Sequence, residues 1–185
     1  MSALPGRTAL PAAMAAVIMT AVGCDAGPPA QAPTHSPAPA GTASPSSPAR
    51  AANRLALVAY TGMWREMQAA GVTADWKDPH LAGYASGEAL RILVRGLRSA
   101  ARHGLVIKGT LVIHPQVISA KPPGAPDQVV IRDCSDDSHW LTYAAATGKL
   151  HDHVPGGHRL VNALVTRNGS RWRVSRLAVY GEGTC

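Results

Sequence analysis

The stretch HRLVNALVTRNGSRWRVSRLAVY (158–180) decides the fold, because it joins two runs of strand-forming residues through a turn signal. Between the runs stands Asn168-Gly169, the strongest short-range signal for a β-hairpin. A two-residue turn at this dipeptide would pair Arg167 with Ser170. That register predicts three further cross-strand pairs: Val165 with Trp172, Ala163 with Val174, and Val161 with Arg176.

Two arginines fall on the apolar face that this register creates, at the end far from the turn. They are Arg159 and Arg176. An inward arginine would need an acidic partner, and Asp133 is the candidate because the run QVVIRD ends nearby in any plausible sheet. Alternatively, a β-bulge re-aims Arg176, or the arginines lie at an exposed end of the sheet. We favour this second interpretation.

The chain from Gly104 onward is rich in β-branched residues, which favour strands. Four runs precede the hairpin: LVIKGTLVI (105–113), QVISA (116–120), QVVIRDC (128–134) and HWLTYAA (139–145). Together with the hairpin they predict a long antiparallel sheet.

Two helices are predicted before the sheet. Apolar residues recur every four positions over 51–70, and Gly71 is a natural end. The second helix runs from a cap at Ser86 to about His103. The expected buried faces are Leu55, Ala59, Met63 and Met67, flanked by Val58, Gly62 and Ala70, and then Leu90, Leu93, Val94, Leu97 and Ala101.

Two helices, a long antiparallel sheet and a final hairpin containing GSRWRV (169–174) resemble the NTF2-like (cystatin-like, SnoaL-type) cone fold. The segments DCSDDSHW (133–140), PGGHR (155–159) and GTC (183–185) also resemble small actinobacterial lipoproteins assigned to this superfamily. The resemblance implies an α+β fold whose N-terminal helices pack on a curved antiparallel β-sheet and leave a pocket at the open end. It implies no single function, because this fold hosts isomerases, hydrolases, cyclases and domains without known activity.

The N-terminal segment predicts export and a lipid anchor. Arg7 precedes an uncharged apolar run, TALPAAMAAVIMTAVG (8–23), which is too short to span a bilayer and is typical of a signal peptide. The residues before Cys24 resemble a bacterial lipobox, so we expect cleavage there and a lipid on the Cys24 thiol. The chain would then lie on the extracellular face of the cell membrane. The alternative is ordinary secretion, with Cys24 left free or removed.

A Pro/Ala/Ser-rich segment follows, with too few large apolar residues to fold. The predicted organisation is a signal peptide (1–23), a lipidated cysteine with a disordered tether (24–49) and one domain (50–185). If Cys24 carries lipid, Cys134 and Cys185 remain as a pair in an oxidising compartment. We therefore predict a disulfide between them, which would pin the C-terminus.

Candidate catalytic residues follow from the resemblance. The NTF2-like isomerases and cyclases use an Asp or His inside the cone, often with a tyrosine, as general acid and base. The matching residue types here are Asp75, Asp78, His80 and Tyr84 in the loop between the helices, and Asp133 and His139 around an expected strand connection. Asp and Ser clusters are also ordinary turn residues, and no nucleophile motif is present.

The remaining candidates concern metals and charge. His151, His153 and His158 could share a metal ion, but no third ligand stands at a diagnostic spacing, so we predict neither metal nor other cofactor. Arginines at helical spacing form a basic stripe on the second helix: Arg91, Arg95, Arg98 and Arg102. The stripe is either a docking surface for an anionic partner or an ordinary solvated face. The net charge of +7 suits anionic neighbours.

These features predict a lipid-anchored extracytoplasmic binding module. Its ligand would be a small apolar molecule in the cone or an anionic envelope component on the basic stripe. The second hypothesis is a pocket enzyme of the isomerase, cyclase or hydrolase type. No nucleic-acid partner is expected, because no aromatic-basic recognition motif is present. The resemblance also implies a homodimer formed through the sheet.

Overall fold

The computed structural model describes residues 47–151 and 156–185. The predicted leader, Cys24, nearly all of the tether and His153 lie outside the described residues. No helix of the described residues is long and apolar enough to cross a bilayer. The helices of this part are α1 (Ser47–Gly71), α2 (Leu81–Tyr84) and α3 (Gly87–Arg102), and its strands are β1 (Leu105–Val112), β2 (Gln116–Lys121), β3 (Gln128–Ala144), β4 (His158–Asn168) and β5 (Arg171–Glu182).

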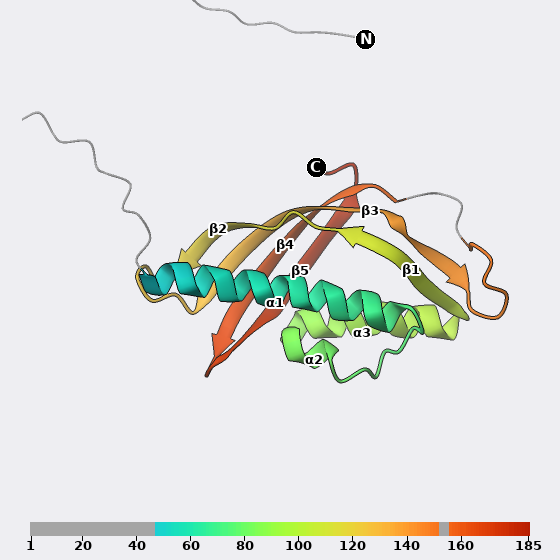
Figure 1. The fold of residues 1–185 in the computed structure, drawn as a ribbon, viewed down its shortest axis with the longest axis horizontal. Helices are drawn as coiled ribbons and strands as arrows, with labels where there is room; N and C mark the ends of the chain where they lie inside the picture. Colours follow the sequence, from blue (N-terminus) through green and yellow to red (C-terminus); the bar gives the residue numbers. More distant parts are fainter. Residues whose placement is uncertain (1–46, 152–155) are drawn as a thin grey trace, which may run out of the picture. The chain divides into compact units, whose positions relative to one another are not determined.

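The strands form one antiparallel sheet in the order β1-β3-β4-β5. β2 pairs with the same edge of β3 as β1, so that β1 lies along the C-terminal half of β3 and β2 along the N-terminal half. In Figure 1, α1 crosses in front of the curved sheet, and α3 lies below the C-terminal part of α1. The predicted fold class, N-terminal helices packed on a curved antiparallel sheet, is confirmed.

The core lies between the helices and one face of the sheet. Alternate strand residues point into it, as the two-residue period of a strand requires. Those that are at most 3% exposed include Val129, Ile131, Asp133, Val161, Ala163, Val165 and Val174.

The predicted buried face of α1 is partly wrong. Ala59, Met63 and Met67 are buried, but Leu55 is 49% exposed and Val58 60% exposed. Tyr60 and Trp64 take their place against the sheet. Because apolar residues surround much of this helix, spacing alone does not fix which side packs inward. On α3, Leu93 and Leu97 are buried as predicted, whereas Ala101 is exposed and Ser86 makes no capping hydrogen bond.

One strand replaces the two that were predicted between residues 128 and 145. β3 is continuous through DCSDDSHW, so this segment is not a strand connection. Its polar side chains make local hydrogen bonds instead. Asp136, for example, accepts a hydrogen bond from the Ser138 backbone N–H at 2.9 Å.

The β4–β5 hairpin forms, but the predicted register is wrong by two residues. Asn168 pairs with Arg171 and Val165 with Val174, which leaves Gly169 and Ser170 as the turn. Gly169 supplies the positive φ, 61°, that the first turn position requires. A shift of two residues keeps the same side chains facing inward.

A bulge lies between Leu164 and Val165 of β4, whose partners on β5 are Arg176 and Val174. Ser175 is therefore the extra residue. The bulge turns Arg176 to solvent and buries Leu177 (5% exposed), so the bulge prediction is confirmed. Asp133 is not the partner of Arg176.

Candidate functional site: a buried carboxylate and a basic groove

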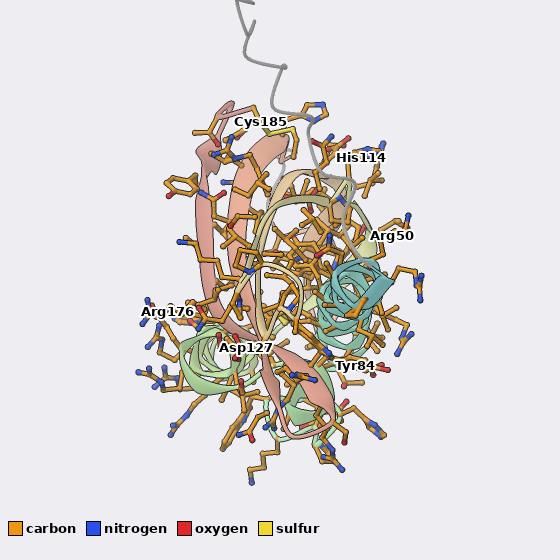
Figure 2. The ribbon with its side chains drawn as sticks, turned by 90° about the vertical axis from the view of Figure 1, so that its left-hand side faces the viewer. Arg50, Tyr84, His114, Asp127, Arg176 and Cys185 are labelled. Carbon is orange, nitrogen blue, oxygen red and sulfur yellow. A yellow bond between two sulfur atoms is a disulfide. The ribbon has the colours of Figure 1, made fainter. Side chains whose placement is uncertain are left out.

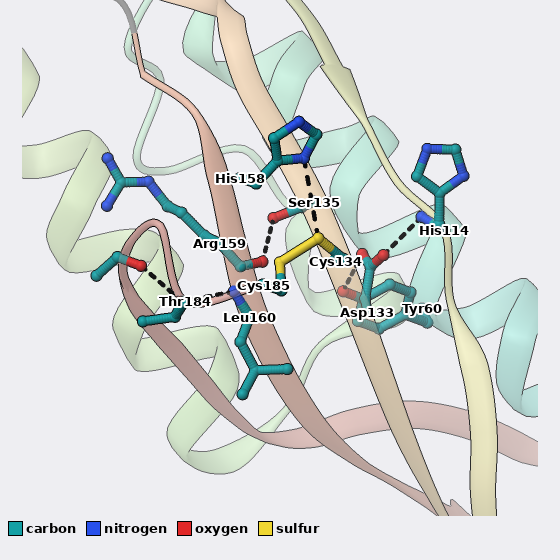
Figure 3. The surroundings of a disulfide bond; sticks show 11 residues. Tyr60, His114, Asp133, Cys134, Ser135, His158, Arg159, Leu160, Thr184 and Cys185 are labelled. Atoms are coloured by element: carbon teal, nitrogen blue, oxygen red, sulfur yellow. Dashed lines mark hydrogen bonds between the residues drawn. A yellow bond between two sulfur atoms is a disulfide. The ribbon is translucent and has the colours of Figure 1, made fainter.

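Asp133 lies on the inner face of β3 and is 1% exposed. Its Oδ2 accepts a hydrogen bond from the Tyr60 hydroxyl at 2.8 Å, and its Oδ1 accepts one from the His114 backbone N–H at 2.5 Å (Figure 3). Tyr60 belongs to α1, and His114 to the break between β1 and β2. The carboxylate therefore joins the first helix to the interrupted edge of the sheet.

The hydroxyl of Tyr60 is held in its protonated form. Burial raises its pKa well above the ordinary value of 10.0, and the negative charge of Asp133 raises it further. The ring packs edge-to-face on Trp64, which packs in the same way on Trp140, with ring centroids 6.3 Å and 6.2 Å apart. Both carboxylate oxygens are thus occupied inside an aromatic cluster. This arrangement suits a structural contact better than a base that must meet a substrate.

The segments DCSDDSHW and PGGHR meet at one end of the sheet. Asp137 accepts hydrogen bonds from Arg159 Nε at its Oδ2 and from the Gly157 N–H at its Oδ1, both at 2.7 Å. Any side chain on Gly156 would overlap the Asp137 carboxylate. Asp137 therefore explains the glycine at position 156 and the position of Arg159.

The terminal GTC segment folds back onto the same end of the sheet. Thr184 Oγ1 accepts a hydrogen bond from the Leu160 N–H at 2.9 Å. Cys134 and Cys185 form the predicted disulfide, with their Cα atoms 5.8 Å apart (Figure 3). His158 Nδ1 lies 3.8 Å from the Cys134 sulfur. These contacts tie the C-terminus to the middle of β3.

The other catalytic candidates make local contacts on other parts of the chain. Asp75 and Asp78 accept hydrogen bonds from the backbone two residues further on, as turn residues do, and His80 is exposed. His139 is exposed on β3. Tyr84 is half-buried, and its hydroxyl accepts a hydrogen bond from Arg65 at 3.1 Å.

The histidine candidates do not form a metal centre in the part that the structure describes. His151 and His158 are both exposed. Within residues 47–151 and 156–185, no group of three histidine, cysteine or acidic side chains could hold a metal ion. Asp136 lies near His158 and His139, and its pKa is lowered, mainly by the Ser138 backbone hydrogen bond and to a lesser degree by these imidazoles.

The basic stripe of α3 is exposed along its length. Arg91, nearest the N-terminus of the helix, lines a groove of about 570 Å³ between α3 and the neighbouring strands. Arg176 lines the same groove from β5, because the bulge turns it outward. Figure 2 shows Arg176 on the side of α3, among nitrogen-tipped side chains. We call this site the basic groove; its other lining residues are Gly87, Glu88, Gln128, Leu164, Thr166 and Ser175.

An apolar hollow of about 300 Å³ adjoins the basic groove. Glu88, Leu164 and Arg176 line both, and the hollow extends over the sheet to Val130 and Ala178. The site therefore places the side chains of Arg91, Arg176 and Glu88 beside an apolar hollow.

Sequence reasoning missed two features of these sites. Tyr60 was not identified as the partner of Asp133, and Arg176 was not connected with the stripe on α3. The apolar surroundings of Tyr60 in the helix pattern were one available signal, because a buried tyrosine hydroxyl needs a hydrogen-bond partner.

No protein-family model and no curated protein matches the chain. Several solved structures are similar to it. An NTF2-like protein with a cystatin-like fold from Novosphingobium aromaticivorans is 14% identical, with a TM-score of 0.43, over 76% of this chain and 92% of that one. A protein of unknown function with a cystatin-like fold from Nostoc punctiforme is 11% identical, with a TM-score of 0.42, over 69% and 92%. Aln2 from a Streptomyces species is 13% identical, with a TM-score of 0.44, over 68% and 89%. We take no activity from these similarities.

Proposed function

We propose that this chain is a lipid-anchored binding module on the extracellular face of the cell membrane and that it binds an anionic, phosphate-bearing polymer of the envelope. The observation that carries the proposal is the basic groove, which Arg91 of α3 and Arg176 of β5 line together. Two guanidinium groups from different elements line the groove beside one carboxylate, that of Glu88, and leave its lining with a net positive charge. Guanidinium groups match phosphate geometry closely. Arg95, Arg98 and Arg102 extend the positive charge along α3.

Sequence features support the proposed location. Cys24 follows an apolar leader in the pattern of a lipobox, and a disulfide persists best in an oxidising compartment. Removal of the leader, whose one charged residue is Arg7, would take the net charge from +7 to +6, and this positive balance favours association with anionic polymers. Fatty-acid labelling of the wild-type chain and of Cys24→Ala in cells tests the anchor. Label that persists in the variant would contradict it.

The interior supports surface binding rather than chemistry in the cone. Tyr60, Met63, Leu97 and Ile131 are 0% exposed and occupy the space between helices and sheet. Asp133, the one catalytic candidate on the inner face of the described sheet, has both oxygens engaged. The geometry therefore favours a binding module over an isomerase, cyclase or hydrolase.

Isothermal titration with poly(glycerol phosphate) tests the groove. The double variant Arg91→Glu/Arg176→Glu should bind about tenfold more weakly or worse, because two charge-assisted contacts become repulsive. The matched control is Lys121→Glu/Lys149→Glu, which makes the same change in net charge at exposed positions outside the groove. An equal loss in both variants would mean that the polymer senses only net charge and would overturn the assignment.

A further inference from the structure

The solvent side of α1 combines positive charge with exposed aliphatic side chains. Residues of both kinds lie on it at helical spacing: Arg50, Arg54 and Arg65, with Leu55 and Val58. Leu55 and Val58 are 49% and 60% exposed. The one acidic residue of α1, Glu66, forms an ion pair with Arg65 at 2.7 Å. This side of the helix therefore has apolar and cationic groups without a free negative charge.

A groove of about 380 Å³ runs between this side of α1 and the tip of the β4–β5 hairpin. Leu55 and Val58 line it from α1, Arg171 and Trp172 from β5, and Tyr84 from α2. Among the described residues, none that lines this groove is acidic. It thus adds the half-buried Tyr84 and a further guanidinium group to the surface of α1, whereas Trp172 is only 9% exposed.

We propose that this surface docks on an anionic lipid bilayer. We call it the α1 docking surface and define it by Arg50, Arg54, Leu55, Val58, Tyr84 and Arg171. Its aliphatic side chains enter the boundary between headgroups and acyl chains, where such groups are stable. Its guanidinium groups contact lipid phosphates, and each basic residue near an anionic surface adds to the attraction.

Charge complementarity and the position of α1 both favour the bilayer as the partner. Basic residues around exposed aliphatic ones are the composition of surfaces that lie in a membrane interface. α1 is also the first described element after the segment that begins at Cys24. If Cys24 carries lipid, as the proposed function holds, the chain length of residues 24–46 allows a span of at most about 80 Å, so the bilayer is within reach.

Docking by α1 would also orient the domain. Figure 2 shows Arg50 and Tyr84 on one side of the view and Arg176, beside α3, on the other. A bilayer bound at the α1 docking surface would leave the basic groove facing away from the membrane, open to a polymer of the envelope.

Vesicle co-sedimentation of the chain from Asp25 onward, which lacks both the apolar leader and Cys24, tests the proposal without any lipid anchor. The protein should bind vesicles that contain phosphatidylglycerol and not vesicles of phosphatidylcholine alone. Leu55→Ser/Val58→Ser should lower the partition coefficient about tenfold or more, at unchanged charge, since two aliphatic groups no longer enter the interface. The matched control is Ile118→Ser/Val179→Ser, which removes two aliphatic residues of similar exposure, 47% and 48%, from the sheet.

Several outcomes would overturn this proposal. They are failure of the parent chain to bind anionic vesicles, equal losses in the two serine variants, and a change in oligomeric state by Leu55→Ser/Val58→Ser that accounts for its loss. The last would assign the surface to a second copy of the chain. Circular dichroism checks that both variants fold. Arg91→Glu/Arg176→Glu should keep most vesicle binding while it loses the polymer, so failure of the basic groove is distinguishable from failure of the α1 docking surface.

Discussion

Tyr60 and Asp133 place a polar contact inside a core that is otherwise mostly apolar. We expect Tyr60→Phe to lower the free energy of unfolding at pH 7 by about 1.5–3 kcal/mol, because it leaves a buried carboxylate with one donor fewer. Urea denaturation measures this change. Tyr180→Phe is the control, since Tyr180 is 46% exposed and its loss should have little effect. Equal stability of wild type and Tyr60→Phe would refute the structural role of the pair.

The same pair predicts a pH dependence of stability. The pKa of Tyr60 is raised in the folded state, so the folded chain keeps a proton that the unfolded chain loses above pH 10. This contribution is fully present below pH 10 and falls by at most about 1.4 kcal/mol per pH unit above it. Tyr60→Phe should remove that part of the alkaline decline. Parallel stability curves for the two proteins above pH 10 would contradict the prediction.

The sequence identified Asp133 as a candidate site residue but did not identify Tyr60 as its partner. Its true partner stands 73 residues away, on a helix whose rotation decides whether Tyr60 faces the sheet. Helix rotation follows from packing against the sheet, and the apolar pattern of α1 permits more than one orientation. Asp133 was therefore predictable as a candidate site residue, whereas its hydrogen bond with Tyr60 was not.

Among the elements, β1 contains a position that only glycine can occupy. Gly109 has φ of 109°, and a Cβ there would overlap the carbonyl oxygen of His139 on β3. Gly109→Ala should therefore disrupt the pairing of β1 with β3 and lower the free energy of unfolding by about 2 kcal/mol or more. Gly148→Ala is the control, because Gly148 also has positive φ, 65°, but meets open space. Gly148→Ala should lower the free energy of unfolding by about 1 kcal/mol. Comparable losses of stability in the two variants would contradict the steric argument.

The hairpin shows why elements are easier to predict than their register. The alternation of apolar and polar residues, together with the turn residues, correctly predicted both strands within residues 158–180. The dipeptide Asn168-Gly169 nevertheless misplaced the turn, because the turn uses Gly169 at its first position rather than its second. The bulge that exposes Arg176 followed from a conflict already visible in the sequence, a charge on an apolar face. The basic groove depends on that bulge and on the approach of α3, so spacing along the chain could not reveal it.

For the whole domain, the disulfide is the feature whose loss should matter most broadly. Cys134 and Cys185 are separated by 51 residues, and a cross-link over such a loop contributes about 4 kcal/mol on the chain-entropy account. The free energy of unfolding of Cys134→Ser/Cys185→Ser should therefore be lower by about 4 kcal/mol. Urea denaturation measures this loss as a midpoint at a lower urea concentration. Wild type assayed with reductant should match the double variant. Unchanged stability in both would refute the role of this bond.

The disulfide also divides the domain mechanically. The second half of β3, all of β4 and all of β5 lie within one covalent ring. A pull on the chain ahead of α1, such as the proposed membrane anchor would exert, can draw out the helices and the first strands but cannot open the ring. The disulfide therefore prevents this force from extending about 50 residues, which would otherwise add roughly 170 Å of extended chain. Under such a pull the residues ahead of Cys134 can extend, whereas residues 134–185 remain closed by the disulfide.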